Sequence, residues 1–469
     1  EYTRFVDAGG YQARKYWKQL PSWEEGMKLF RDSTGRPGPS TWEAGSYPAG
    51  QDEFPVSGVS WYEAAAYAEF AGKSLPTIAH WYRAAEPSAT SFIVQASNFS
   101  RQGPARVGQY QGIGPFGTAD MGGNVKEWCW NETGEGQRYL LGGAWNSPSY
   151  QFHEPDAQSP FARTATYGFR CVRYTGAVAA EVLAPKARRF RDYAKEKPVG
   201  DEVFRAYAGL YDYEASDLKA AVESSDDSSP DWRLEKVSFA AAYGKERVPA
   251  YLYLPKSAKP PFQALVYHPG ASAMQLPSSR TLAGLAQLDF LLRSGRAVLY
   301  PVLQGTYERR LPPTTARPEQ RTRIIQRVQD VRRSYDYLES RPDIDRSRLG
   351  YLGHSWGSAW GPTMVALEPR IRAAVFLDGG FYSSFLLPET DILNFAPRAK
   401  APVLMLNGRH DFIFPLETSQ LPMFRTLGTP EKLKRHVALD TAHDVVVMRK
   451  DVIREVLGWL DQHLGPVGR

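Results

Sequence analysis

Short apolar segments and longer amphipathic segments alternate through the second half of the chain. The apolar segments have the length of buried strands and lie at 248–254, 264–267, 297–301, 349–352, 373–377 and 403–406. Apolar residues recur every three or four positions from Ile324 to Leu338 and again from Val452 to Leu460, which predicts helices with one buried face. This alternation predicts a mostly parallel sheet with helices on both faces.

The first half has a different pattern, dense in aromatic residues and glycine, with few clear strands. Ser60 and Glu63 form a capping box at the start of an apolar run that ends at Phe70, and a second helix is predicted to begin at Thr77. The pattern predicts an irregular α+β domain held by aromatic packing. We expect a first domain at 1–174, a linker at 175–200 and a second domain at 201–469. Within the second domain, 203–211 is predicted as a helix and 223–230 as a polar turn.

Composition excludes several classes of protein. The 469 residues are 42% hydrophobic, which is enough apolar material for the cores of two domains. The formal charge is only +6, and the Lys and Arg residues are scattered or mixed with acids, so the sequence does not support nucleic-acid binding. No run of 18 apolar residues exists to span a membrane. The chain opens at Glu1 without Met, so we expect a mature form or a fragment, and an extracytoplasmic location stays open. Cys129 and Cys171 are too few for a disulfide framework or a metal cluster.

The strongest motif is Gly-His-Ser-Trp-Gly at 353–357, which follows the apolar segment 349–352 and precedes a helix-compatible stretch of small residues. This is the strand–turn–helix context of a nucleophile elbow, in which Ser355 would be the nucleophile. The motif is short enough to occur by chance, so its interpretation depends on whether an acid and a histidine follow at suitable positions. Asp411 follows the segment 403–406, and His443 precedes the last helix. The order Ser, Asp, His is that of α/β-hydrolases.

Each member of this triad has a chemical task. His443 would take the proton of Ser355 as general base, and a buried Asp411 would hold the imidazole in the correct tautomer. Asp378, which follows the segment 373–377, is the alternative acid. An oxyanion hole needs two N–H donors. We assign these to Trp356, directly after the nucleophile, and to Ala271, where Gly270 lets the backbone approach the substrate.

Other polar residues near the predicted site are given no catalytic role. His354 is expected to point away from the site as a structural residue. His268 and His410 lie at strand ends near the site, where roles in lining the pocket are open but roles as metal ligands are not expected. Asp444 is expected to cap the last helix or to be exposed. Trp356, Trp360 and Tyr307 offer aromatic surface near the cleft, although a core position for Trp360 is equally compatible with the sequence.

Three stretches of the second domain resemble dienelactone-hydrolase and acetyl-xylan-esterase-type α/β-hydrolases: Tyr-His-Pro-Gly at 267–270, the elbow at 353–357, and residues 394–414. More narrowly, the whole chain resembles the end of bacterial serine/threonine kinases that carry a sulfatase-modifying-factor domain followed by such a hydrolase. The resemblance implies ester hydrolysis without a catalytic metal and a kinase region upstream. The short excursion 381–400 between two strands leaves an open cleft, which favours small acyl groups or accessible esters. The resemblance to the family implies acetylated carbohydrate as one substrate class, with aryl, hydroxycinnamoyl and polyester substrates left open.

Five motifs of the first domain occur in the order typical of formylglycine-generating enzymes, the sulfatase-modifying-factor family, which has a C-type-lectin-like fold. They are Pro-Val-Ser-Gly-Val-Ser-Trp at 55–61, Ser-Leu-Pro-Thr at 74–77, Gly-Asn-Val-Lys-Glu-Trp at 123–128, Leu-Gly-Gly-Ala-Trp at 141–145 and Gly-Phe-Arg-Cys at 168–171. The family binds copper through two cysteines, of which Cys171 matches the second, but Thr166 stands at the first. A lone thiolate cannot make that site, and His80 and His153 are interpreted as structural.

The resemblance also implies one structural Ca²⁺, with Asp120, Gly123, Val125 and Glu127 at the matching positions. The alternative is a Glu127 that only accepts hydrogen bonds from the backbone. The sequence therefore predicts a serine carboxylester hydrolase with a non-catalytic C-type-lectin-like accessory domain, acting on a small or polymeric ester. A sensor or binding protein with a vestigial hydrolase and a serine peptidase remain as alternatives, and the oligomeric state is left open.

Overall fold

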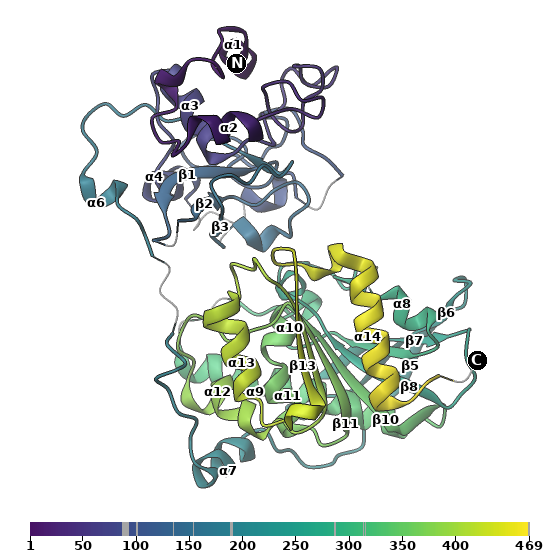
Figure 1. The fold of residues 1–469 in the computed structure, drawn as a ribbon. Coiled ribbons are helices and arrows are strands. Elements are labelled where there is room, and N and C mark those ends of the chain that lie inside the picture. The colour runs from purple at the N-terminus through teal and green to yellow at the C-terminus, as the bar shows by residue number, and fades with distance from the viewer. Residues whose placement is uncertain are drawn as a thin grey trace. The chain divides into compact units, whose positions relative to one another are not determined.

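The computed structural model describes residues 1–86, 93–99, 102–134, 136–152, 154–187, 191–285, 288–312, 314 and 316–467. The chain divides into two compact units, Glu1–Arg188 and Arg189–Arg469 (Figure 1). The predicted linker 175–200 is shared between them. Within the first unit, the side-chain amide of Asn131 donates to the carbonyls of Val182 and Ala184. Within the second unit, Arg191 pairs with Asp391 at 2.6 Å.

In its described residues, the first unit has a small sheet of order β3-β2-β1-β4. Its strands are β1 (Lys126–Glu132), β2 (Arg138–Leu141), β3 (Asp156–Gln158) and β4 (Tyr167–Gly168), and its helices are α1 (Tyr2–Asp7), α2 (Trp23–Leu29), α3 (Trp61–Phe70), α4 (Ile78–Ala85) and α6 (Ala180–Leu183). Helix α3 begins at the predicted capping box of Ser60 and Glu63, and Thr77 caps α4. Trp61, Trp81 and Trp128 are fully buried, so aromatic packing forms this core.

The second unit is built on a sheet of order β13-β12-β11-β10-β8-β9-β7-β6-β5. Its strands are β5 (Ala221–Asp226), β6 (Trp232–Ala240), β7 (Arg247–Pro255), β8 (Phe262–His268), β9 (Ala297–Pro301), β10 (Ile344–His354), β11 (Ile371–Leu377), β12 (Val403–Gly408) and β13 (Lys434–Leu439). The strands from β13 to β9 run parallel, and β7, β6 and β5 add antiparallel pairs. This mostly parallel sheet, with an elbow after a central strand, is the α/β-hydrolase fold.

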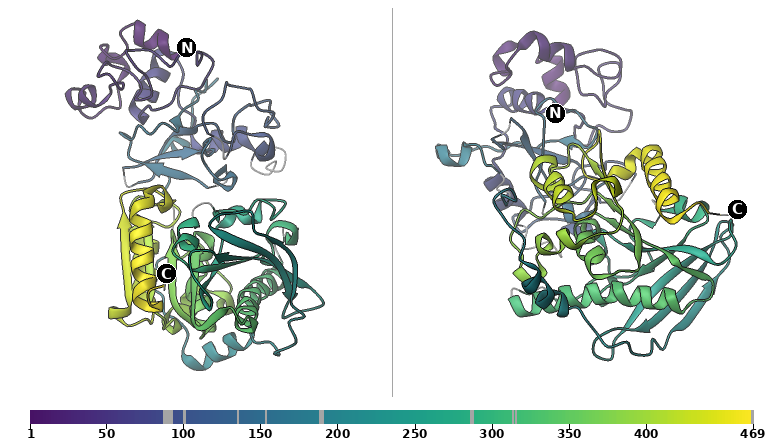
Figure 2. Two further views of the ribbon diagram at one scale, coloured as in Figure 1. Left: turned by 90° about the vertical axis from the view of Figure 1, so that its right-hand side faces the viewer. Right: turned by 60° about the horizontal axis from the view of Figure 1, so that its bottom comes forward.

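Helices cover both faces of this sheet (Figures 1 and 2). They are α7 (Asp201–Gly209), α8 (Asp289–Arg293), α9 (Arg317–Ser340), α10 (Trp356–Ala359), α11 (Gly361–Leu367), α12 (Ile392–Phe395), α13 (Leu421–Thr426) and α14 (Arg449–Leu464). Neighbouring strand residues point to opposite sides: Tyr351 packs in the cluster that contains Val331 of α9, and Leu352 packs in the cluster that contains Val456 of α14. Burial on both faces explains why these strands are continuous apolar segments.

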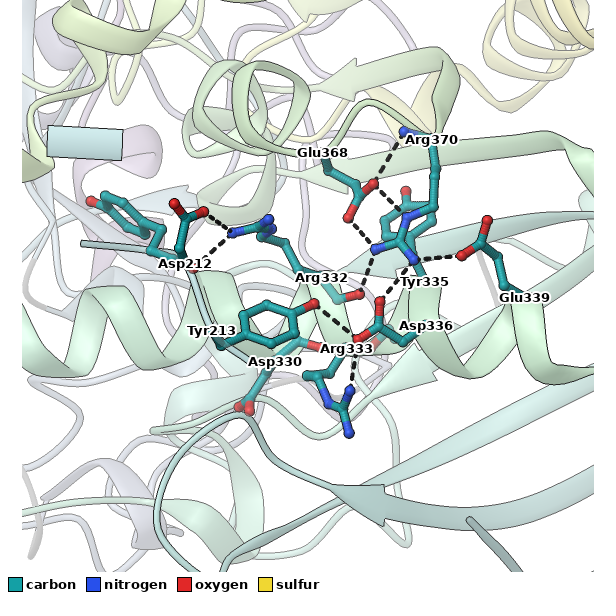
Figure 3. A network of polar contacts seen from close by, with 12 residues as sticks. Asp212, Tyr213, Asp330, Arg332, Arg333, Tyr335, Asp336, Glu339, Glu368 and Arg370 are labelled. Carbon is teal, nitrogen blue, oxygen red and sulfur yellow. Dashed lines mark hydrogen bonds and ion pairs between the residues drawn. The ribbon is translucent and has the colours of Figure 1, made fainter. Parts of the chain in front are cut away.

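A polar network anchors the start of the second unit to α9 and to the turn before β11 (Figure 3). Asp336 of α9 accepts hydrogen bonds from Arg370 at 2.8 Å, from Arg333 at 2.8 Å and from the Tyr213 hydroxyl at 3.0 Å. Arg370 also pairs with Glu368 at 2.6 Å. Asp336 is therefore a structural partner of arginines in α9 and in the turn before β11.

Two predictions need correction. The polar run 223–230 was expected to be a turn, but 221–226 forms strand β5, whose residues are all exposed. An edge strand that buries neither face lacks the apolar alternation that identifies a strand.

Tyr307, expected near the cleft, is fully buried, and its hydroxyl pairs with that of Tyr300 at 2.7 Å. In the described residues no helix has the length and apolarity needed to cross a membrane.

Candidate active site

Ser355 lies at a sharp turn between β10 and α10, with φ of 50°. Positive φ is unusual for a residue with a side chain and is the strained geometry of a nucleophile elbow. The flanking glycines are required by close backbone packing: a Cβ on Gly357 would lie 2.1 Å from the carbonyl oxygen of His268, and a Cβ on Gly353 would lie 2.6 Å from the carbonyl carbon of Gly357. The local sequence thus folds as the elbow that the motif predicts.

A continuous hydrogen-bond chain links the predicted triad. Ser355 Oγ is 2.9 Å from His443 Nε2, and His443 Nδ1 is 2.8 Å from Asp411 Oδ2. Ser355 and Asp411 are buried, at 5% and 3% exposure. The three side chains are thus hydrogen-bonded in the order that nucleophilic catalysis requires.

Backbone groups hold the Asp411 carboxylate in place. Its Oδ1 accepts the N–H groups of Ile413 at 2.8 Å and Phe414 at 3.0 Å, which leaves Oδ2 for the imidazole. Burial lowers the pKa of His443, but the carboxylate of Asp411 outweighs this effect, and the pKa is raised to about 9. Asp378, the alternative acid, accepts the N–H of Val445 at 2.9 Å and does not hydrogen-bond His443. The structure therefore pairs the imidazole with Asp411.

The two predicted oxyanion donors occupy equivalent local positions. Trp356 is the first residue of α10, and Ala271 is the first residue of the 3₁₀ helix Ala271–Met274, which Gly270 precedes. The first N–H groups of a helix have no acceptor within it. Gly270 also lies against the nucleophile, since a Cβ built on it would be 3.5 Å from Ser355 Cβ. Both N–H groups are thus placed at residues that border Ser355.

Burial separates the neighbouring histidines into different roles. His268 is fully buried, its Nδ1 lies 2.9 Å from the Tyr351 hydroxyl, and burial holds its pKa well below the usual value. His268 also packs edge-to-face on Trp356 at 4.8 Å. His410 is exposed and pairs with Asp440 at 2.8 Å. His268 is therefore a buried packing residue, and His410 is a surface residue.

His354 and Asp444 differ from their predictions. His354 does not point away from the site: its Nε2 is 3.5 Å from Asp378 Oδ2, and its Nδ1 faces Gly270. Asp444 is neither exposed nor a helix cap, because it lies in a half-buried position before the 3₁₀ turn Val445–Met448 and its side chain makes no cap hydrogen bond. The only sequence signal for this arrangement is that each residue directly neighbours a predicted triad residue.

A series of aromatic contacts runs from the imidazole of His443 into the core. Phe414 lies 5.9 Å from the His443 ring, Tyr382 lies 5.9 Å from Phe414, and Trp360 lies 6.4 Å from Tyr382. Trp360 is only 3% exposed, so it is a core residue. The guanidinium of Arg327 stacks on Trp356 at 4.3 Å.

The predicted calcium residues of the first unit do not fit a calcium ion. Glu127 accepts hydrogen bonds from Arg170 at 2.5 and 2.7 Å and from the Trp81 indole at 2.7 Å. Asp120 Oδ2 accepts a hydrogen bond from the N–H of Gly108, and the backbone carbonyl of Asp120 accepts one from the Arg170 guanidinium at 3.3 Å. A guanidinium therefore already supplies positive charge beside Glu127. The hydrogen bonds from Arg170 and Trp81 to the Glu127 carboxylate come from side chains. The alternative prediction, that Glu127 accepts hydrogen bonds only from the backbone, is therefore also incorrect. Gly123 and Val125 lie in the same loop.

The cysteines of the first unit form no disulfide, and burial raises the pKa of Cys171 to about 12. His80 lies 2.6 Å from the hydroxyl of Thr77, and His153 lies outside the described residues. Among the residues that the structure describes, groups of His, Cys, Asp and Glu close enough to hold a metal occur in the second unit: His354, Asp378 and Asp444, and Asp378, Asp411 and His443.

Comparison with known proteins matches the first unit to one family model. Residues 1–175 match the sulfatase-modifying factor enzyme 1-like domain. The serine/threonine-protein kinase pkn1 of Chlamydia pneumoniae is 31% identical over 204 residues, which cover 37% of this chain and 31% of that protein. Hercynine oxygenase of Mycolicibacterium thermoresistibile is 25% identical over 228 residues, covering 44% and 46%. The chain thus spans roughly a third to a half of the length of these relatives.

Solved structures similar to the chain include two acetyl xylan esterases. The enzyme from Paenibacillus sp. R4 has a TM-score of 0.46 and 18% identity, covering 57% of this chain and 97% of its own. Acetyl xylan esterase 1 from Thermoanaerobacterium has a TM-score of 0.46 and 17% identity, covering 58% and 96%.

Proposed function

We propose that this chain, in which a sulfatase-modifying factor enzyme 1-like domain precedes an α/β-hydrolase unit, is a serine carboxylester hydrolase. The observation that carries the proposal is the hydrogen-bond chain from Ser355 through His443 to Asp411 at a nucleophile elbow. A serine hydroxyl is a weak nucleophile unless a base is hydrogen-bonded to it and a third group orients that base. Each condition has a named residue here.

In the proposed reaction, Ser355 Oγ attacks the ester carbonyl carbon while its proton moves to His443 Nε2. The N–H groups of Trp356 and Ala271 donate to the negative carbonyl oxygen, and each such donor typically contributes about 3 kcal/mol to transition-state stabilisation. His443 then gives the proton to the departing alcohol, which leaves an acyl group on Ser355. Water, deprotonated by the same imidazole, hydrolyses this acyl-enzyme and restores the serine.

The excursion between β11 and β12 limits how the site is covered. Residues 381–400 contain only α12 and two single-turn 3₁₀ segments, Pro388–Thr390 and Ala396–Arg398. Such a short excursion is too small for a large lid. We propose small acyl groups or accessible ester chains as substrates, with acetylated carbohydrate as the first class to test and no metal needed for the chemical steps.

For the first unit we propose a non-catalytic accessory role. Thr166 and Cys171 do not make a thiolate pair, and the thiol of Cys171 stays protonated at neutral pH because burial raises its pKa. The kinase relatives matched by this unit support a further proposal, that a kinase region precedes the chain in the whole protein.

The test is hydrolysis of p-nitrophenyl acetate by the full chain and by Ser355→Ala. We expect hydrolysis that the substitution abolishes, together with stoichiometric phosphonylation of Ser355 by a phosphonofluoridate probe, with loss of fluoride, detected by mass spectrometry. Equal background rates for both proteins would favour a sensor with a vestigial hydrolase. Parallel assays with matched p-nitroanilides separate the enzyme classes, because a peptidase would cleave the amides at comparable kcat/KM.

A further inference from the structure

A second group of polar side chains lies beside the triad and has no role in the proposed reaction. His354 ends β10, Asp378 follows β11, and Asp444 follows His443 in the loop after β13. One imidazole nitrogen and two carboxylate oxygens from these residues lie within 4.8 Å of one another. Strands β10 and β11 are paired in register with His354 opposite Leu377, so the sheet itself brings the first two residues together.

Three buried polar atoms in this group have no hydrogen-bond partner: His354 Nε2, Asp378 Oδ1 and Asp444 Oδ1. Asp378 is completely buried, and only its other oxygen is used, by the N–H of Val445. A buried polar atom without a partner destabilises the folded protein. Each of the three clustered side chains thus has an unused buried polar atom, which points to a ligand that the three side chains share.

The charges in this region also require a positive partner. Asp378 lies beside the triad carboxylate of Asp411, and Asp444 lies beside Asp378. Within the described part of the chain, the ion pairs of Asp378 and Asp411 are with imidazoles, His354 and His443, and neither Lys nor Arg pairs with any of the three carboxylates. Asp411 has the His443 imidazole as its partner, so the shortage of positive charge falls on Asp378 and Asp444. A buried carboxylate that lacks a cationic partner is strongly unfavourable, and a coordinated metal ion is one of the few ways to compensate it.

We propose that His354, Asp378 and Asp444 bind one divalent transition-metal ion, Zn²⁺ or Mn²⁺. One imidazole with two carboxylates suits these ions better than the hard cations, which prefer oxygen ligands alone. Bonds of about 2.1 Å place ligand atoms up to about 4.2 Å apart, so shifts of a few tenths of an ångström complete the site. The His354 side chain is 18% exposed, which gives the ion an entry path.

The bound ion would act as a positioning element. It would join the ends of β10 and β11 to the loop that carries His443, and so hold the imidazole relative to Ser355. No step of ester hydrolysis passes through the ion.

The test uses the full chain, treated with EDTA and then equilibrated with Zn²⁺ or Mn²⁺ by dialysis, with metal content measured by inductively coupled plasma mass spectrometry. We expect one ion per chain in the wild type and in Ser355→Ala, which keeps the ligands, so a failure of the esterase proposal leaves this result unaffected. His354→Gln and Asp444→Asn should each weaken binding at least tenfold.

The exposed pair His410 and Asp440 provides a matched control, because it is also an imidazole with a carboxylate near the same edge of the sheet. His410→Gln and Asp440→Asn should retain the ion. Loss of the ion in these control variants, or its retention in His354→Gln, would overturn the assignment. A measurement on the wild type alone avoids any folding defect of the variants: the ion should raise Tm, and a wild type that binds neither metal contradicts the proposal.

Discussion

His443 Nδ1 lies 2.8 Å from Asp411 Oδ2, although Asp378 offers a second buried carboxylate nearby. The difference comes from the backbone around the two acids. Asp411 directs one oxygen to two N–H groups and the other to the imidazole. Asp378 uses an oxygen for the N–H of Val445. The acid after β12 therefore orients the imidazole, and the acid after β11 does not.

Asp411→Asn should lower kcat for p-nitrophenyl acetate by about 10⁴-fold while leaving the fold intact. An amide can donate to His443 Nδ1, which stabilises the tautomer that cannot accept the serine proton. Asp378→Asn should lower kcat far less, because Asp378 makes no hydrogen bond to the imidazole. Stopped-flow or plate assays at saturating substrate, with circular dichroism as the folding check, distinguish the two. A larger loss in Asp378→Asn would reassign the acid.

Esterase activity should require alkaline pH in protein that EDTA keeps free of divalent ions. Only the neutral imidazole can accept the proton, and the pKa of His443 is raised to about 9, chiefly by Asp411 against the opposing effect of burial, with smaller contributions from Asp378 and Asp444. We therefore expect kcat/KM to rise with pH and to level off above about 9. Asp440→Asn, on an exposed acid, should leave the inflection in place. A plateau already reached at pH 7 would contradict this assignment.

The sequence predicted those features that depend on continuous burial or on a motif with a fixed chain order. Strands β8 to β12 are apolar because both faces are covered, and Ser355, Asp411 and His443 were predicted from their places after strands and before the last helix. Exposed strand β5 gave no such signal. Side-chain directions were also beyond the sequence: His354 turns toward Asp378, and Tyr307 turns into the core, because tertiary packing decides both.

Gly357→Ala should destabilise the second unit by about 1–3 kcal/mol and reduce activity, because the added Cβ would meet the carbonyl oxygen of His268 at 2.1 Å. The backbone must move to relieve this contact, and Ser355 moves with it. Gly458→Ala is the matched control, since a Cβ there meets nothing within 4 Å and Gly458 lies inside α14. Gly458→Ala should raise the free energy of unfolding by about 0.5–1 kcal/mol. Calorimetry gives both values, and equal Tm values for the two variants would contradict the packing argument.

The network around Asp336 should stabilise the second unit without affecting the chemistry. Asp336→Ala removes the shared partner of Arg333, Arg370 and Tyr213, so we expect the free energy of unfolding to fall by about 1–3 kcal/mol. The loss is smaller than for a fully buried network because the Asp336 side chain is 22% exposed. KM and kcat for p-nitrophenyl acetate should remain at wild-type values below the melting transition. Asp451→Ala removes an acid of the first turn of α14 and its pair with exposed Arg454, and it should lower Tm less than Asp336→Ala does. A loss of kcat in Asp336→Ala at a temperature where it is folded would show that α9 influences the site.

The pair of Glu127 and Arg170 should take the place of a metal in the first unit. Arg170→Met leaves the Glu127 carboxylate, only 7% exposed, without its cation, and breaking such a pair typically costs about 3–5 kcal/mol. We expect the calorimetric transition of the first unit to shift down while that of the second unit stays in place. Added Ca²⁺ should leave the wild-type transition unchanged, because the guanidinium already occupies both carboxylate oxygens. A rise in Tm with Ca²⁺ at millimolar concentration would show instead that these residues form a calcium site.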